Sequence, residues 1–193
     1  MITGNNSFSK FPPGWMVVYS MTGLLFLIMG IQVLFPKITI PIIGLFISAF
    51  ASVDFIVHEF GHVIFGFLGT FIGVMGGTLA QLFIPAICLY LSFWRRQWVG
   101  MSIFAFWIGQ SLLQISAYIR DARPQTLKLF SPWSLLGGGQ AIHDWHYLLE
   151  KTGLLPADQF LGWCVFLVGV IFLLASAGIM FARAIGYPRT KFM

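Results

Sequence analysis

The sequence predicts an all-α, polytopic membrane protein built as a bundle of about five transmembrane helices. Of its 193 residues, 58% are hydrophobic and only 9% are charged, whereas a soluble domain usually carries about 25% charged residues. The mean hydropathy of the chain is +0.87. Several apolar runs are long enough to cross a hydrocarbon core of about 30 Å, which takes roughly 20 helical residues. These observations place the chain in a lipid bilayer.

The expected spans are separated by short polar or helix-breaking segments. The second apolar run would be about 40 Å long as a single helix, so we expect it to tilt, kink or protrude from the hydrocarbon core. A break near Gly44 would raise the number of spans to six. The spans cover residues 15–35, 41–67, 78–94, 98–119 and 160–183.

The longest polar connection covers about residues 120–159, before the last span. Within it, a stretch from Gln140 to Lys151 is expected to form a short helix that ends at Gly153. The connection is too short for a soluble domain, and the chain shows no internal repeat, so residues 1–193 form a single integral membrane domain. Five crossings would leave the two ends of the chain on opposite sides of the membrane.

The formal net charge of +5 comes from 11 Lys and Arg residues against 6 acidic ones. The basic residues lie mostly between or beyond the apolar runs, a pattern that suits lipid headgroups better than nucleic acid. We therefore expect lipid partners, no nucleic acid, and a multi-pass location, which in a bacterium is the cytoplasmic membrane. Cys88 and Cys164 lie in separate apolar runs and are expected to pack as small hydrophobic residues.

All four histidines fall in two short motifs, HEFGH at 58–62 and HDWH at 143–146. Residues four apart share one face of a helix, so His58 and His62 can both point at one Zn²⁺, with Glu59 beside them to take a proton from zinc-activated water. The HExxH pattern also occurs by chance. In an apolar run, however, each charged group costs roughly 2 kcal/mol or more, so such residues usually line a site. A structural polar cluster is the alternative.

Two histidines do not complete a catalytic zinc site, which typically has three protein ligands and one position for water. The HEFGH motif lies near the end of its span, and two crossings later the chain returns to the same side with the HDWH motif. The two motifs can therefore meet. Asp144 is one candidate for the third ligand, and His143 or His146 is the alternative.

These motifs resemble the site-2 protease family of intramembrane zinc metalloproteases. The resemblance rests on HEFGH in a membrane helix, a glycine-containing segment at 73–77, and a later motif that contains an aspartate. It implies that His58 and His62 are zinc ligands, that Glu59 is the general base, and that Asp144 is the third ligand. Transmembrane or membrane-bound proteins would be the substrates. The family's Asn-Pro-Asp-Gly or Leu-Asp-Gly context and its frequent PDZ module are absent from this sequence, so the chain would be a divergent, minimal member.

Four further residues are candidates for supporting roles. Asp54 lies one helical turn before His58 and could accept its free ring N–H, or it could instead reach solvent or an arginine. Gly76 and Gly77 could form an extended segment that offers backbone groups to an unfolded substrate, or a tight turn between spans. Gln81 could contact substrate or hydrogen-bond between helices.

Peptide hydrolysis at a zinc site, with Glu59 as general base, is the function that the sequence favours. The alternative is a metal-binding membrane protein without protease activity, such as a sensor, an assembly factor or a subunit of an oligomer or larger complex. A site closed by four histidines would favour that alternative, since no position would remain for water. A haem or di-iron redox protein is a third hypothesis, but it gives no reason for Glu59 to lie within HExxH.

Overall fold

The structure is a computed structural model, and it describes residues 13–127 and 143–186. Within these ranges it is helical and has no strand. The five long helices are α1 (Pro13–Leu34), α2 (Pro41–Gly66), α3 (Thr70–Trp94), α4 (Trp98–Arg120) and α7 (Asp158–Ala184). A short helix, α6 (Asp144–Lys151), and a 3-10 turn (Leu155–Ala157) precede α7. Each of the five is long and apolar enough to cross a membrane, so the predicted all-α polytopic bundle is confirmed.

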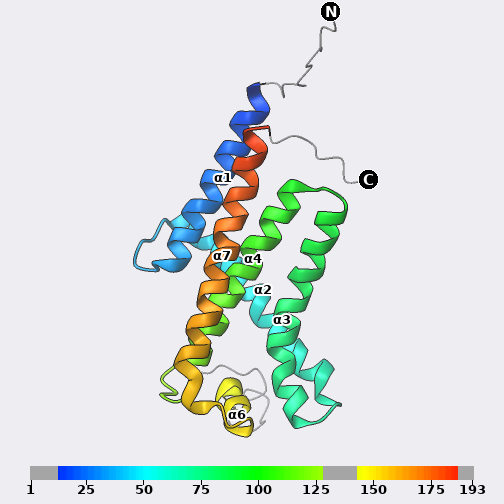
Figure 1. Cartoon of the computed structure of the whole chain (residues 1–193), viewed down its shortest axis with the longest axis vertical. Helices are drawn as coiled ribbons and strands as arrows, with labels where there is room; N and C mark the ends of the chain where they lie inside the picture. The colour runs from blue at the N-terminus through cyan, green and yellow to red at the C-terminus, as the bar shows by residue number, and fades with distance from the viewer. Residues whose placement is uncertain (1–12, 128–142, 187–193) are drawn as a thin grey trace, which may run out of the picture.

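Helices α4 and α7 form the centre of the bundle (Figure 1). Their backbones approach closely at Gly109 and Gly169, where a methyl carbon on Gly109 would lie 3.0 Å from the Gly169 carbonyl oxygen. The Ser102 hydroxyl donates a hydrogen bond to the Ser176 carbonyl across the same interface. Small residues allow this approach in a membrane, where packing and hydrogen bonds drive helix association. The buried apolar core around them comprises Phe26, Met29, Ile43, Phe106, Leu113, Leu173, Ala177 and Met180.

Helix α1 runs antiparallel to α7 and covers only its C-terminal half. Gly23 faces the ring of Phe181, and Gly30 faces Leu173. Figure 1 accordingly shows the start of α1 and the end of α7 at the same end of the bundle. The expectation that these two ends lie on opposite sides is therefore wrong.

The connection between α1 and α2 explains why the start of α1 and the end of α7 lie at the same end of the bundle. The Ile40 N–H donates to Gln32 Oε1 and ties the start of α2 to the last turns of α1. Helix α2 begins there, beside the middle of the bundle, where its Ile47 carbonyl accepts a hydrogen bond from Gln110 of α4. It then continues toward the α6 end without a break at Gly44. Consecutive helices α1 and α2 thus point the same way.

Helix α3 begins at Thr70, eight residues before the expected start of the third span at 78. The turn falls instead at Gly69, whose φ of 101° is readily adopted only by glycine. Gly76 and Gly77 are therefore helical, and both the extended segment and the tight turn expected there are wrong. In α3 these glycines provide a surface on which α2 packs, with Gly61 directly against the Gly76 carbonyl.

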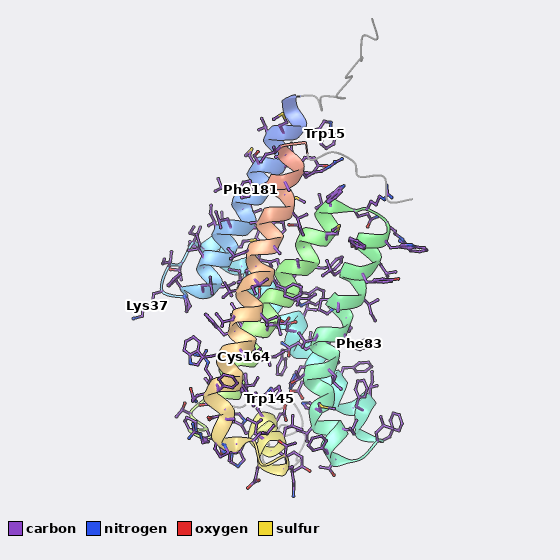
Figure 2. The ribbon with its side chains drawn as sticks, in the orientation of Figure 1. Trp15, Lys37, Phe83, Trp145, Cys164 and Phe181 are labelled. Carbon is purple, nitrogen blue, oxygen red and sulfur yellow. The ribbon has the colours of Figure 1, made fainter. Side chains whose placement is uncertain are left out.

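The short helix before the last span is present as α6. It begins at Asp144 and ends at Lys151, and Gly153 follows with a positive φ of 70°. The expected start at Gln140 lies outside the described residues. Helix α6 lies at the end of the bundle next to the α2–α3 turn (Figure 1), where Figure 2 shows Trp145. This position brings the second histidine motif to the first.

Replacing Gly61 by alanine should loosen the contact between α2 and α3. The added methyl carbon would lie 2.7 Å from the Ala80 Cβ and closer still to the Gly76 carbonyl oxygen, and such overpacking costs about 1–3 kcal/mol. In the matched variant Gly66→Ala, no described atom of another segment lies within 4 Å of the new methyl carbon. Titration with SDS in detergent micelles measures the free energy of unfolding. Equal stabilities for the two variants would contradict this account of the interface.

Candidate metal centre

Three potential ligand atoms converge where α2, α3 and α6 meet. The Nε2 atoms of His58 and His62 are 3.0 Å apart, and Asp144 Oδ2 lies 3.0 Å from the first and 3.2 Å from the second. Within residues 13–127 and 143–186, this is the one cluster of three or more His, Cys, Asp or Glu residues whose ligand atoms come this close. The two motifs, 86 positions apart between His58 and Asp144, meet as the span order predicted.

The size of this triangle fits a small tetrahedral cation. With metal–ligand bonds of about 2.0–2.1 Å, two ligands of a tetrahedral zinc site are about 3.3 Å apart. The three observed separations of 3.0, 3.0 and 3.2 Å fall short of that value by only a few tenths of an ångström. Small side-chain shifts would therefore accommodate the ion.

Hydrogen bonds on the far side of each ring determine which nitrogen faces the triangle. The Nδ1 atom of His62 lies 2.9 Å from the Gly73 carbonyl oxygen, which can only accept, so Nδ1 carries the proton. The Nδ1 atom of His58 lies 3.3 Å from Gln81 Oε1. Both Nε2 atoms then present lone pairs toward a carboxylate oxygen. Such a set of acceptors is repulsive by itself and fits a bound cation.

Asp54 supports His58 through Gln81. Its carboxylate, 1% exposed, accepts hydrogen bonds from Trp107 Nε1 at 2.6 Å and from the Ser111 hydroxyl at 2.9 Å, and Gln81 hydrogen-bonds to it as well. The expected direct bond from His58 to Asp54 is not made, because Nδ1 of His58 faces Gln81 Oε1 and its Nε2 faces Asp144 Oδ2. Gln81 of α3 contacts His58 of α2, so it makes the hydrogen bond between helices that was one of its two predicted roles.

Gly77 lies directly against the two histidine rings. A methyl carbon at this position would be 2.6 Å from His62 Nε2 and 2.7 Å from His58 Nε2. Gly76 instead faces the last turns of α2. A methyl carbon added at Gly76 would lie 2.6 Å from Phe65 Cβ and 2.7 Å from the Gly61 carbonyl oxygen. Both glycines pack against α2. Their expected role of offering backbone groups to a substrate is therefore not supported.

The alternative third ligands point away from the triangle. His143 Nε2 lies 3.2 Å from Asp121 Oδ2, and His146 Nδ1 donates to the Ala122 carbonyl at 2.7 Å. Of the HDWH motif, only Asp144 reaches His58 and His62 among the described contacts. Four histidines therefore do not close a site in this structure.

The centre is partly open, and a second carboxylate lies beside it. The side chains of His58 and His62 are each 23% exposed, and that of Asp144 is 19% exposed. Glu59 lies close enough to interact electrostatically with all three. Burial raises the pKa of Asp144, but when the two histidines are protonated their hydrogen bonds and positive charge outweigh this effect and hold the pKa below its ordinary value. An ionised Asp144 is the form that binds a cation.

Sequence reasoning missed two residues beside the centre. Tyr118 lies within electrostatic reach of Asp144 and Glu59, and its ring packs on that of His143 with centroids 5.8 Å apart. Asp121 contacts His143. Both lie at the end of the fourth span, where polar residues normally face the membrane interface. Their residue types alone therefore did not indicate a position beside the metal centre.

Replacing Gly77 by alanine should weaken metal binding. The new methyl carbon would displace both Nε2 atoms from their positions, and disturbance of groups around metal ligands typically lowers affinity about 10- to 100-fold. Gly178→Ala is the control, because no described atom of another segment lies within 4 Å of its new methyl carbon. Competition between the purified protein and a zinc chelator measures the affinity. Equal affinities of the two variants would show that the rings do not hold the ion here.

Comparison with known proteins assigns no family or function to this chain. No family model matches the chain, and no curated protein or solved structure matches it either. The functional argument therefore rests on His58, His62, Asp144 and Glu59 and on the groups that surround them.

Proposed function

We propose that this protein is a zinc-dependent intramembrane metalloprotease, similar to site-2 proteases, that hydrolyses peptide bonds of membrane proteins. The observation that carries the proposal is the convergence of His58 Nε2, His62 Nε2 and Asp144 Oδ2, with Glu59 beside them. Two histidines and a carboxylate form a known ligand set of catalytic zinc sites. In a bacterium, the location that we propose for such an enzyme is the cytoplasmic membrane.

Each side chain has a defined task in this reaction. His58, His62 and Asp144 would hold the ion, which when bound acts as a Lewis acid toward water and toward the scissile carbonyl. Glu59 accepts a proton from the water whose oxygen attacks the carbonyl carbon. It then returns the proton to the leaving nitrogen as the C–N bond breaks, so that Glu59 ends the cycle ionised as it began.

Exposure of the site supports access for both water and a membrane substrate. About one-fifth of each ligand side chain is exposed, which leaves room for a fourth ligand. The residues next to Glu59 on the outer face of α2 are strongly exposed, with Phe60 at 62% and Ile56 at 64%. In a bilayer this face meets lipid, so a membrane-embedded segment can approach the centre from the side.

Other uses of the same ligands are less well supported. Two histidines and one carboxylate also bind iron(II) in oxygenases, but that chemistry has no need of a carboxylate such as Glu59. A haem ligated by both histidines would require their nitrogens on opposite faces of the iron, whereas His58 and His62 present theirs side by side, 3.0 Å apart. A closed metal site in a sensor or assembly factor is disfavoured because His143 and His146 bond elsewhere.

Replacing Glu59 by glutamine should abolish most hydrolysis and leave the ion in place. Loss of a general base slows such reactions about 10²- to 10⁴-fold, whereas none of the three ligands is changed. The assay uses a panel of synthetic apolar helices with a central Asn-Pro break, each labelled with a fluorophore and a quencher and mixed with the zinc-loaded protein in micelles. Zinc content is measured on the same samples.

Asp144→Ala is the companion variant and should lose both zinc and activity. Cleavage by Glu59→Gln at the wild-type rate would contradict the proposed role of Glu59. A wild-type protein that contains zinc but cleaves no member of the panel would contradict the proposed protease.

A further inference from the structure

The position of Asp144 depends on how α6 is attached to the bundle. Asp144 is the first residue of a helix of eight residues, and its Oδ2 must reach two histidines on a different helix. Leu148 and Leu149 anchor the middle of α6, being 5% and 4% exposed. These apolar contacts leave the direction of the first turn to be defined by other groups.

His143 joins the start of α6 to the segment that follows α4. Its Nδ1 accepts a hydrogen bond from the His146 N–H at 3.2 Å and so caps the helix. The ring proton must then lie on Nε2, which donates to Asp121 Oδ2 at 3.2 Å. Both side chains are buried, with residue exposures of 5% for His143 and 6% for Asp121. One imidazole thus makes both connections, and Asp144 is the next residue.

Asp121 is itself held rigidly. Its carboxylate accepts hydrogen bonds from the Thr126 N–H at 2.9 Å, the Thr126 hydroxyl at 2.7 Å and the Leu127 N–H at 3.0 Å. Burial raises the pKa of Asp121, but these hydrogen bonds and that from His143 outweigh it and place the pKa below its ordinary value. A second tie runs from His146 Nδ1 to the Ala122 carbonyl, at 2.7 Å.

We propose that Asp121 and His143 are positioning residues that direct Asp144 Oδ2 toward the two histidine Nε2 atoms. This role rests on the metal centre of the proposed function, but it does not depend on peptide hydrolysis. It also gives the second histidine motif a purpose other than ligation. His143 holds the segment from which the third ligand projects, and both of its ring nitrogens contact groups other than the three proposed ligands.

The variant His143→Asn separates the two tasks of the imidazole. Asparagine is a favourable helix cap, and its side-chain oxygen can accept the His146 N–H in place of Nδ1. Its side chain is too short to keep the bond to Asp121. Asp121→Asn weakens the same link from the other side. Its one amide oxygen can face either the Thr126 donors or the donors of Leu127 and His143, and its NH2 group then opposes the other set. Glu150→Gln, an exposed position on α6, is the control.

The test is Co²⁺ binding to the full chain in detergent micelles, followed by visible absorption, which reports the number and arrangement of ligands. We expect His143→Asn and Asp121→Asn to raise the dissociation constant for Co²⁺ about 10- to 100-fold and to shift the spectrum toward that of Asp144→Ala. Glu150→Gln should match wild type.

Two results would overturn the inference in distinguishable ways. If Asp144→Ala loses Co²⁺ while His143→Asn and Asp121→Asn bind it with wild-type affinity and spectrum, the centre stands and the positioning role falls. If wild type binds no more Co²⁺ than His62→Ala, the metal centre itself is wrong, and the positioning role falls with it.

Discussion

Because lipid tails are as apolar as leucine side chains, α2 and α3 gain little from hiding apolar surface against each other and depend on close packing of small residues. Gly61 lies against the Gly76 carbonyl, and Gly77 lies against the rings of His58 and His62. This approach has a second effect. It brings the Gly73 carbonyl and Gln81 within hydrogen-bonding distance of the two Nδ1 atoms. The same contact that joins the helices therefore also turns both Nε2 atoms toward Asp144.

The polar groups behind the centre are costly in a membrane, and this cost argues for function. Asp54 is almost fully buried in a helix whose side chains are mostly apolar, and a buried carboxylate is tolerated only when donors satisfy it. Trp107 and Ser111 supply those donors from α4. Through Gln81 the network ends at His58. A bundle that needed only stability would have no reason to keep these groups, since apolar packing would serve as well.

Much of this arrangement could be predicted from residue types and spacing. The apolar runs predicted the spans, and the four-residue spacing of His58 and His62 placed both on one helix face. Counting crossings brought Asp144 to the same end. Spacing did not choose between Asp144 and its neighbours, because that choice depends on the hydrogen bonds of His143 and His146 to residues after α4.

Other features could not be predicted because they depend on which helix faces meet. Gly76 and Gly77 were interpreted as helix-breaking residues, as they would be in water, whereas between two membrane helices they allow close approach. Asp54 lies one turn from His58, yet the ring nitrogens of His58 face Gln81 and Asp144, and Asp54 receives donors from α4. The parallel course of α1 and α2 involves a contact between Ile40 and Gln32 across the connection that joins them. A local sequence pattern contains no information about such partners.

X-ray absorption at the zinc edge of the metal-loaded protein tests the central claim most directly, since it counts the imidazole and oxygen ligands of the ion. The account predicts two imidazole nitrogens and at least one carboxylate oxygen at about 2.0–2.2 Å. A spectrum with three or four imidazoles would contradict it, because His143 or His146 would then bind the metal in place of Asp144.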